Sequence, residues 1–310
     1  MNKTLFYKQR LVVKLETIYM IFSIMLFAYF VVASFEVFGD VKDRANYYRS
    51  FDNLNNYSNP LQLLSGSSIL YGIFFVFGNS FLALSIFAII FLTLKLILLK
   101  KIFHSWAFIL LYMVKFAFVI DLILLKESLA LLLILYAYHS RKKILNYLYI
   151  FLAFLSHLSI SLLLLLRMSK LVIFLVFSIF IVFTVIGSSE ISLVYYYLNK
   201  LNFYSVDGES FIYQNPIFWM STILLLWSLA HLIKTSKYRL RVLLIQIAVF
   251  AIGLLHPLIG IPAFRMWQVG SFIDLFALKY LNSKLLFTIY LLLNSLFLVY
   301  GTIYLKGYLD

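Results

Sequence analysis

The sequence predicts an all-α polytopic integral membrane protein, and three observations lead to this fold class. Hydrophobic residues make up 64% of the 310 positions and charged residues 12%, whereas soluble domains carry about 45–50% apolar and about 25% charged residues. The mean hydropathy is +0.99. The apolar residues also gather into long runs, and a helix needs about 20 such residues to cross the hydrocarbon core of a bilayer. These features exclude a cytoplasmic enzyme, a disordered chain and a nucleic-acid-binding module.

The apolar runs give roughly 9–11 hydrophobic segments when each is compared with the length of a transmembrane helix. In chain order they cover residues 17–35, 81–99, 105–120, 129–138, 144–166, 171–187, 216–230, 242–255 and 285–305, with 265–281 as a weaker candidate. Residues 1–14 lack the small-residue cleavage site of a secretory signal. We therefore expect a single transmembrane domain over residues 1–310.

Lysine and arginine determine the expected orientation, because cytoplasmic loops of membrane proteins are enriched in both. The formal net charge is +14. The basic residues cluster near the N-terminus and at three later turns: Lys3, Lys8, Arg10 and Lys14, then Lys100 and Lys101, then Arg141, Lys142 and Lys143, then Lys234, Lys237, Arg239 and Arg241. This pattern predicts a cytoplasmic N-terminus and outer loops at about residues 36–80 and 188–213.

Residues 144–166 allow two interpretations. Three hydrophobic segments lie between the third and fourth basic turns, and an odd number would place the fourth turn outside. A re-entrant hairpin that turns near His157 removes this conflict, because each arm of about a dozen residues is only about 18 Å long and is tolerated at this depth where it lines a cavity. The alternative is one membrane span followed by a basic outer loop.

Several ionisable residues lie within or beside the apolar segments, where they are costly unless they face a cavity or a partner. Lys115 and Asp121 share one segment, and we expect them either to pair or to extend toward opposite ends. Asp274 is expected to be structural. Between His256 and Arg265, Pro257, Gly260 and Pro262 interrupt the helix and free backbone groups for a ligand.

Six residues share the outer half of the membrane under this topology: Asp43, Arg44, Lys126, His157, His256 and Arg265. A cavity with several cations and a base suits an anionic, lipid-linked substrate, because arginine binds phosphate bidentately and lysine binds it as a point charge. We expect Arg265, assisted by Arg44 or Lys126, to bind a pyrophosphate. The sequence has no Asp-rich metal cluster, so we expect neither a metal nor a cofactor.

Carboxylates and aromatic side chains occur together in the first outer loop, as in sugar-binding surfaces. Asp40, Tyr47 and Tyr48 of this loop, together with Glu127, are the expected glycan-binding residues. Tyrosine is also the ordinary residue of membrane interfaces. For the base that deprotonates a sugar hydroxyl, His157 ranks first, Asp43 second and His256 third, since neutral histidine is ready to accept a proton near pH 7.

At these residues the chain resembles the EpsG family of bacterial exopolysaccharide proteins, within the wider group of Wzy-type O-antigen and capsule polymerases. Three stretches carry the resemblance: Asp43-Arg44-Ala45-Asn46-Tyr47-Tyr48, Lys126-Glu127-Ser128-Leu129-Ala130 through to Ser156-His157-Leu158-Ser159, and Phe264-Arg265-Met266-Trp267. Two positions depart from the family pattern. Lys126-Glu127 replaces an Arg-Gln pair, which loses bidentate phosphate binding, and Asn59-Pro60 replaces a Glu-Pro pair, which removes a carboxylate.

The resemblance implies a fold like that of GT-C membrane glycosyltransferases and an oligosaccharide linked to undecaprenyl diphosphate as substrate. It implies polymerisation of O-antigen, capsule or exopolysaccharide repeat units at the outer face of the bacterial inner (cytoplasmic) membrane. Membrane lipid and a chain-length regulator are the further partners to consider, and nucleic acid is not expected. The rivals are a membrane O-acyltransferase acting on the same glycans and a lipid-linked glycan flippase or transporter.

Overall fold

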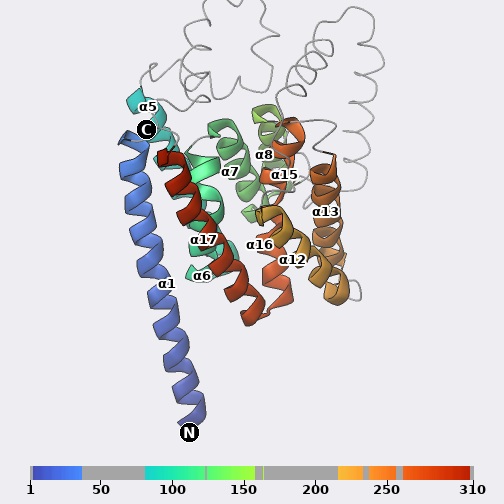
Figure 1. Ribbon diagram of the computed structural model, residues 1–310. Helices are drawn as coiled ribbons and strands as arrows, with labels where there is room; N and C mark the ends of the chain where they lie inside the picture. Colours follow the sequence, from blue (N-terminus) through green and yellow to red (C-terminus); the bar gives the residue numbers. More distant parts are fainter. Residues whose placement is uncertain are drawn as a thin grey trace, which may run out of the picture. The chain divides into compact units, whose positions relative to one another are not determined.

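The computed structural model describes residues 3–36, 81–122, 124–157, 163, 216–232, 237–255 and 261–307 (Figure 1). Across these ranges the chain is built of helices without a β-strand, which confirms the all-α prediction. The chain divides into two compact units, one formed by Met1–Leu158 with Lys284–Asp310 and the other by Ser159–Ser283. The outer loops at 36–80 and 188–213 lie outside the described residues almost entirely, and the single transmembrane domain stays a prediction.

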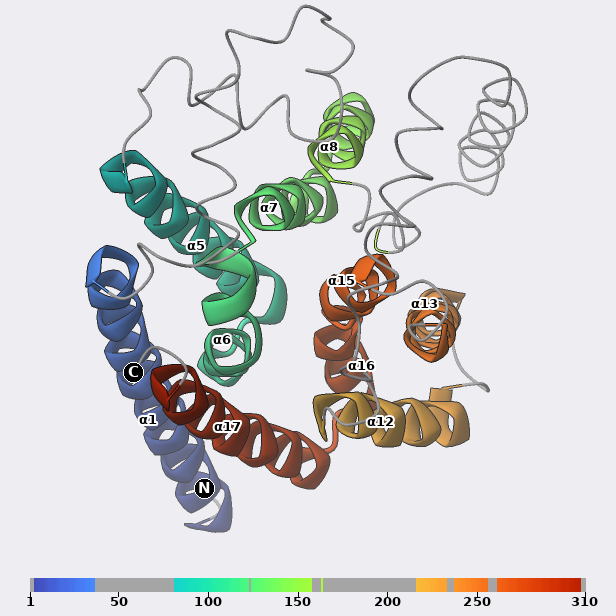
Figure 2. The ribbon, with the colours of Figure 1, turned by 45° about the horizontal axis from the view of Figure 1, so that its top comes forward.

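The first unit contains seven described helical segments. In chain order they are α1 (Lys3–Glu36), α5 (Phe81–Phe103), α6 (Trp106–Tyr112), the π-helix η2 (Met113–Asp121), α7 (Leu125–His139), α8 (Lys143–Ser156) and α17 (Lys284–Gly307). Figure 2 shows the long helix α1 at the edge of this unit, with α5, α6 and α17 to one side of it. The predicted segments 17–35, 81–99 and 285–305 correspond to α1, α5 and α17.

Two polar contacts show that α1 and α5 run antiparallel. At one end, the buried Ser85 hydroxyl donates to the Ser34 carbonyl oxygen over 2.5 Å. At the other end, the Glu16 carboxylate accepts from the Ser105 hydroxyl at 2.5 Å and from the Trp106 backbone N–H at 2.8 Å. The turn after α5 therefore lies at the same end of the unit as the N-terminal half of α1.

The second basic turn is a tight one between α5 and α6. His104 adopts a left-handed backbone conformation with φ of 57°, and the Ser105 hydroxyl accepts from the Ala107 N–H at the start of α6. The Lys100 ammonium lies 4.8 Å from the centre of the Trp106 ring. The chain then reverses after η2, so α7 returns toward this end and α7 and α8 meet at Arg141 and Lys142. Lys14 of α1 and the basic turns at Lys100-Lys101 and Arg141-Lys142 thus lie at one end of the first unit.

The second unit contains α12 (Pro216–Leu232), α13 (Lys237–Leu254), α15 (Ile261–Gly270) and α16 (Ile273–Leu281). Phe218, near the start of α12, stacks on Phe250 near the end of α13, with ring centres 5.6 Å apart. The Arg239 guanidinium, near the start of α13, lies 5.9 Å from the Tyr280 ring at the end of α16. Arg239 and Arg241, the residues of the fourth basic turn that begin α13, are therefore at the end opposite Phe218 and the start of α15.

Several predicted segments differ from the observed helices. Residues 265–281 do not form one crossing helix but two helices of 10 and 9 residues, and each is shorter than the roughly 20 residues needed to span. The break follows Gly270-Ser271, the kind of pair at which helices kink. Residues 105–120 are likewise divided into α6 and a π-helix, in which Leu122 N–H donates to the Ala117 carbonyl five residues earlier.

The helix in the predicted segment 144–166 ends before the segment does. Helix α8 stops at Ser156, and His157 follows as its C-cap with an extended backbone (φ −164°, ψ 132°). The helix therefore ends where the re-entrant interpretation places a turn. The returning arm lies outside the described residues apart from position 163, so the choice between a hairpin and a single span stays open.

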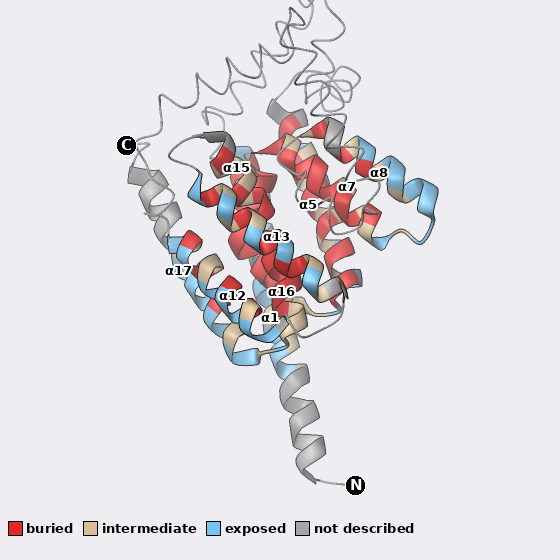
Figure 3. Cartoon of the chain, turned by 90° about the vertical axis from the view of Figure 1, so that its right-hand side faces the viewer, coloured by how far each residue is buried: buried red, intermediate tan, exposed pale blue. Residues whose placement is uncertain are grey.

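Among the described residues, the stretch Lys14–Phe35 is the one helix that is long and apolar enough to cross a membrane by length and composition. Shorter apolar helices cover Lys143–Ala153, Pro216–His231 and Lys284–Val299. Buried residues line the inner faces of α5, α7 and α16, whereas α17 and α8 turn many exposed residues outward (Figure 3).

Candidate functional site

The structure brings Glu127 and His157 together. Glu127 lies in the first turn of α7, and His157 caps the C-terminus of α8, where its backbone N–H donates to the Ala153 carbonyl at 3.1 Å. His157 Nε2 lies 3.3 Å from Glu127 Oε1. The His157 side chain is 22% exposed and that of Glu127 is 1% exposed. A buried carboxylate thus faces a histidine that is partly open to its surroundings.

This geometry suits general base catalysis. A carboxylate beside an imidazole orients the ring and stabilises the imidazolium that forms when the ring accepts a proton. A separation of 3.3 Å lies slightly beyond the usual hydrogen-bond range, and such contacts often tighten when substrate binds. The pair therefore has the arrangement of a base and the residue that orients it.

The pair lies at the end of the first unit opposite the basic turns. Helix α8 begins directly after Arg141 and Lys142 and ends at Ser156, next to His157. Lys126 precedes Glu127 in the same turn of α7 and has an intermediate exposure. The structure thus brings three sequence-predicted residues, Lys126, Glu127 and His157, to one end of the unit.

Arg265 belongs to the second unit. It lies in the first half of α15 with intermediate exposure, at the end of that unit away from Arg239. Because Arg265 and His157 belong to different units, a cavity shared by the two stays a prediction. Six predicted site residues lie outside the described residues: Asp40, Asp43, Arg44, Tyr47, Tyr48 and His256.

A buried ion-pair network joins four helical segments of the first unit. The Lys95 ammonium of α5 forms an ion pair with Asp121 at the end of η2, and neither side chain is exposed. Lys95 also donates to the Ser128 hydroxyl at 2.6 Å and to the Ser128 carbonyl at 3.0 Å. Asp121 accepts from the Ser128 hydroxyl and from the Tyr112 hydroxyl, each at 2.7 Å. We refer to these four residues as the Lys95 network.

The network corrects one prediction from the sequence. Lys115 and Asp121 do not pair with each other, nor do they extend to opposite ends, because helix packing gives each another partner. The Lys115 ammonium donates to the Tyr290 hydroxyl of α17 and lies 4.9 Å from the centre of the Tyr290 ring. Asp121 instead faces Lys95 of α5.

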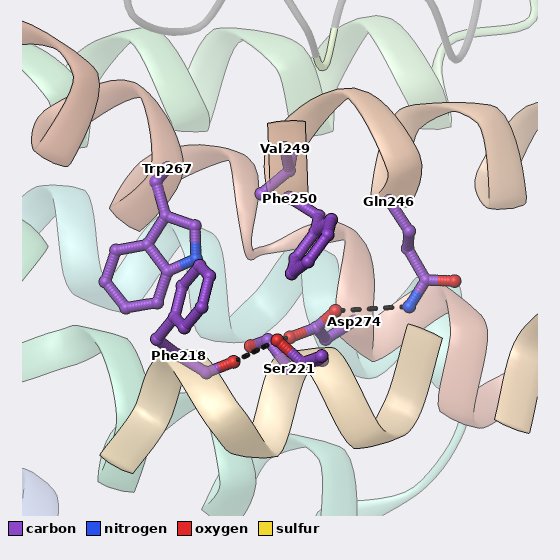
Figure 4. A pocket seen from close by; sticks show the side chains of 8 residues that line it. Phe218, Ser221, Gln246, Val249, Phe250, Trp267 and Asp274 are labelled. Atoms are coloured by element: carbon purple, nitrogen blue, oxygen red, sulfur yellow. Dashed lines mark hydrogen bonds between the residues drawn. The ribbon is translucent and has the colours of Figure 1, made fainter. Parts of the chain in front are cut away.

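The second unit has its own buried polar cluster beside a small cavity (Figure 4). Asp274 of α16 accepts from the Ser221 hydroxyl at 2.7 Å and from the Gln246 amide at 3.3 Å. Phe218, Phe250 and Trp267 form the apolar wall of the cavity. Its volume of about 10 Å³ is close to the minimum for one water molecule, so it is too small for a sugar ring.

One member of these clusters could be predicted to have a buried partner from its sequence context. Lys95 is the one charged residue in the run 81–99, and a charge in an apolar segment is costly unless it has a partner. Tyr112, Ser128, Ser221 and Gln246 carry no such signal, because buried hydroxyls and amides are common and their partners are distant in sequence.

The site and fold define an all-α protein of two helical units, each with a buried carboxylate cluster, and one with a carboxylate–histidine pair. No family model, no curated protein and no solved structure matches this chain.

Proposed function

We propose that the protein is a membrane-embedded glycosyltransferase that polymerises lipid-linked oligosaccharide repeat units. The observation that carries the proposal is the Glu127–His157 pair, with the two atoms 3.3 Å apart. Both residues belong to the longest stretch that resembles the EpsG and Wzy-type polymerases. They are 30 residues apart in sequence. The sequence similarity by itself therefore does not require the two side chains to lie in contact.

Apolar stripes on the helix surfaces support a polytopic membrane protein. Exposed large hydrophobic residues recur at spacings of three and four, which place them on one face of a helix. They are Ile18, Phe22, Met25 and Tyr29 on α1, Leu285, Ile289, Leu292 and Leu296 on α17, and Trp219, Ile223 and Leu226 on α12. Apolar surface of this extent favours lipid over water as the surroundings, and it occurs in both units.

The sidedness of the proposal rests on the positive-inside rule applied to each unit by itself. The Glu127–His157 pair lies opposite the basic turns of the first unit, and Arg265 lies opposite Arg239 in the second. The rule then predicts the outer side of the membrane for both. This is the side on which the resemblance expects chain growth.

The proposed step transfers the growing glycan to the next lipid-linked unit. A hydroxyl oxygen of the acceptor sugar attacks the anomeric carbon of the donor glycan. The bond from that carbon to the diphosphate breaks, and its electron pair leaves with the diphosphate. The His157 imidazole accepts the hydroxyl proton, while Glu127 stabilises the resulting imidazolium; a positioned base contributes about 10²–10⁴-fold in rate.

Arg265, with Arg44 or Lys126, is proposed to neutralise the leaving diphosphate. Charge that develops on the leaving group is stabilised by a fixed cation, and loss of one such donor costs about 2.7–4 kcal/mol of barrier. In this proposal the cations do the work for which other enzymes use a metal ion. Asp40, Tyr47 and Tyr48 bind the glycan from the first outer loop.

Deletion of the gene, with complementation by variants at matched protein levels, tests the function. We expect His157→Gln to leave single repeat units on the surface lipid and Glu127→Gln to shorten the polymer. His231→Gln is the matched control, because that exposed histidine of α12 contacts its own helix at the Trp227 carbonyl. Full-length polymer from His157→Gln would move the base to Asp43 or His256.

The same deletion separates the rival functions. Loss of a flippase removes surface units altogether, and loss of an O-acyltransferase leaves polymer length unchanged while the acyl groups disappear. Either result from the deletion strain would overturn the polymerase proposal.

Cysteine labelling tests the membrane topology, since the chain contains no cysteine. A membrane-impermeant maleimide applied to intact cells should label Ser58→Cys in the first outer loop and leave Ser140→Cys in the third basic turn unlabelled. Both should react after permeabilisation. Labelling of Ser140→Cys in intact cells would contradict the proposed orientation.

A further inference from the structure

We propose that the Lys95 network positions Glu127 against His157, so that Lys95, Asp121 and Ser128 are positioning residues for the reaction. This inference rests on the proposed function, because it assigns to His157 the role of base. Glu127 belongs to helix α7. The network includes one residue of this helix, Ser128, which directly follows Glu127.

Two bonds from Lys95 converge on Ser128. The ammonium donates to both its hydroxyl, at 2.6 Å, and its backbone carbonyl, at 3.0 Å. The Ser128 hydroxyl in turn donates to Asp121 at 2.7 Å. Both the backbone and the side chain of one residue in the first turn of α7 are therefore fixed by groups from α5 and η2.

Helix α7 begins without a side-chain cap. Its N-cap is Leu124, whose side chain makes no hydrogen bond to the N–H groups of the first turn. A polar N-cap such as serine or aspartate would normally hold this turn in place. Here the Lys95 network holds the turn from the side.

Fixing Ser128 also fixes the direction of Glu127. Successive residues of an α-helix are about 100° apart around the axis, so a rotation of the first turn that moved Ser128 would carry the Glu127 carboxylate away from His157. The pair is 3.3 Å apart, and a shift of about 1 Å in a catalytic geometry can lower the rate about a hundredfold.

Burial makes the network rigid. Lys95, Asp121, Tyr112 and Ser128 all have side chains without exposure to solvent, so water does not compete for their hydrogen bonds. Satisfied buried networks of this kind specify one arrangement of the surrounding helices. The network therefore sets a single position for the first turn of α7.

Ser128→Ala tests the proposal with a small change. It removes the hydroxyl that links Lys95 and Asp121 but keeps both charges. Ser85→Ala is the matched control, because this buried serine also bonds across helices, to the Ser34 carbonyl, at the contact between α1 and α5. With purified protein and lipid-linked repeat units, we expect Ser128→Ala to lower kcat about ten- to a hundredfold with KM unchanged, and Ser85→Ala to leave kcat as it is.

Wild-type kcat in Ser128→Ala, or an equal loss in Ser85→Ala, would overturn the positioning role. The double variant Lys95→Met/Asp121→Leu adds a second check, because replacing a whole buried ion pair by apolar residues is usually tolerated by the fold. A folded double variant with the wild-type kcat would also contradict the proposal.

A measurement that does not depend on enzymatic activity tests this inference separately from the proposed function. Peptide mass spectrometry measures how fast diethyl pyrocarbonate modifies His157. The variant Glu127→Gln provides the reference rate for a His157 side chain that has lost its carboxylate partner. We expect Ser128→Ala to shift the His157 rate toward that of Glu127→Gln and Ser85→Ala to keep the wild-type rate. If the rate shifts in protein that shows no polymerase activity, the positioning role stands and the proposed function fails. An unchanged rate overturns the positioning role alone.

Discussion

Asp121 of the first unit and Asp274 of the second are both buried carboxylates, and they are held in different ways. Asp121 has no exposed surface and binds the Lys95 ammonium together with two hydroxyl groups, from Tyr112 and Ser128. Asp274 is 2% exposed and accepts from the Ser221 hydroxyl at 2.7 Å and from the Gln246 amide at 3.3 Å. Each carboxylate lies beside a helix break, Asp121 at the end of η2 and Asp274 in the first turn of α16.

The difference lies in what happens when one partner is lost. Removing one member of a buried ion pair leaves a charge without compensation, whereas replacing both members by apolar residues is often neutral. A hydrogen-bonded cluster loses one bond at a time. Loss of one member of the Lys95–Asp121 ion pair is therefore expected to lower the free energy of unfolding more than loss of one hydrogen bond to Asp274.

The largest effect on stability is expected when one partner of the Lys95–Asp121 ion pair is removed. Lys95→Met and Asp121→Asn should each lower the free energy of unfolding by about 3–5 kcal/mol, because each leaves an uncompensated or poorly satisfied buried group. Equilibrium unfolding of the purified protein in mixed micelles measures the loss. The double variant Lys95→Met/Asp121→Leu should recover most of it. A double variant as unstable as the single ones would show that the two units do not differ in this way.

An intermediate effect is expected from two matched hydroxyl deletions. Tyr112→Phe and Ser221→Ala each remove one hydroxyl that lies 2.7 Å from a buried carboxylate oxygen. Hydrogen bonds to charged groups contribute about 1.5–3 kcal/mol. Asp121 keeps Lys95 and Ser128, so we expect Tyr112→Phe near the lower value and Ser221→Ala near the upper one, measured by the same unfolding titration. The reverse order would mean that Lys95 and Ser128 do not compensate for the lost tyrosine hydroxyl.

The smallest effect concerns the apolar wall around Asp274. A Cβ added at Gly253 would lie 2.7 Å from Phe218 Cε2 and 3.2 Å from Trp267 Cδ1. The rings must shift to admit it, and such overpacking costs about 1–3 kcal/mol. We expect Gly253→Ala to lower the unfolding midpoint modestly. Ala251→Ser, on an exposed position of the same helix, is the control and should leave the midpoint unchanged.

The sequence predicted the helices better than their interruptions. Apolar runs located α1, α5, α12 and α17, because a span-length run of hydrophobic residues has few alternatives to a helix. The division of 105–120 into α6 and η2, and of 265–281 into α15 and α16, depends on packing against other helices and leaves only weak local traces such as Gly270-Ser271.

The candidate site was predictable where one residue type is unusual in its surroundings. Glu127 and His157 stand out in apolar segments, and the structure brings them together. The partner of Asp121 was not predictable from its own segment, which contains Lys115, because the choice of Lys95 depends on how α5 packs beside η2. Six of the ten predicted site residues lie outside the described residues, and their roles stay predictions.

In the π-helical stretch Met113–Asp121, the number of residues matters as much as their type for the contact between Asp121 and Lys95. Asp121 is its last residue, and the direction of its carboxylate depends on how many residues precede it. Deletion or insertion of one residue would turn Asp121 by about 100° around a regular helix and move it about 1.5 Å along the axis, which takes it out of reach of Lys95. The stretch should therefore accept many apolar substitutions but no change in residue number.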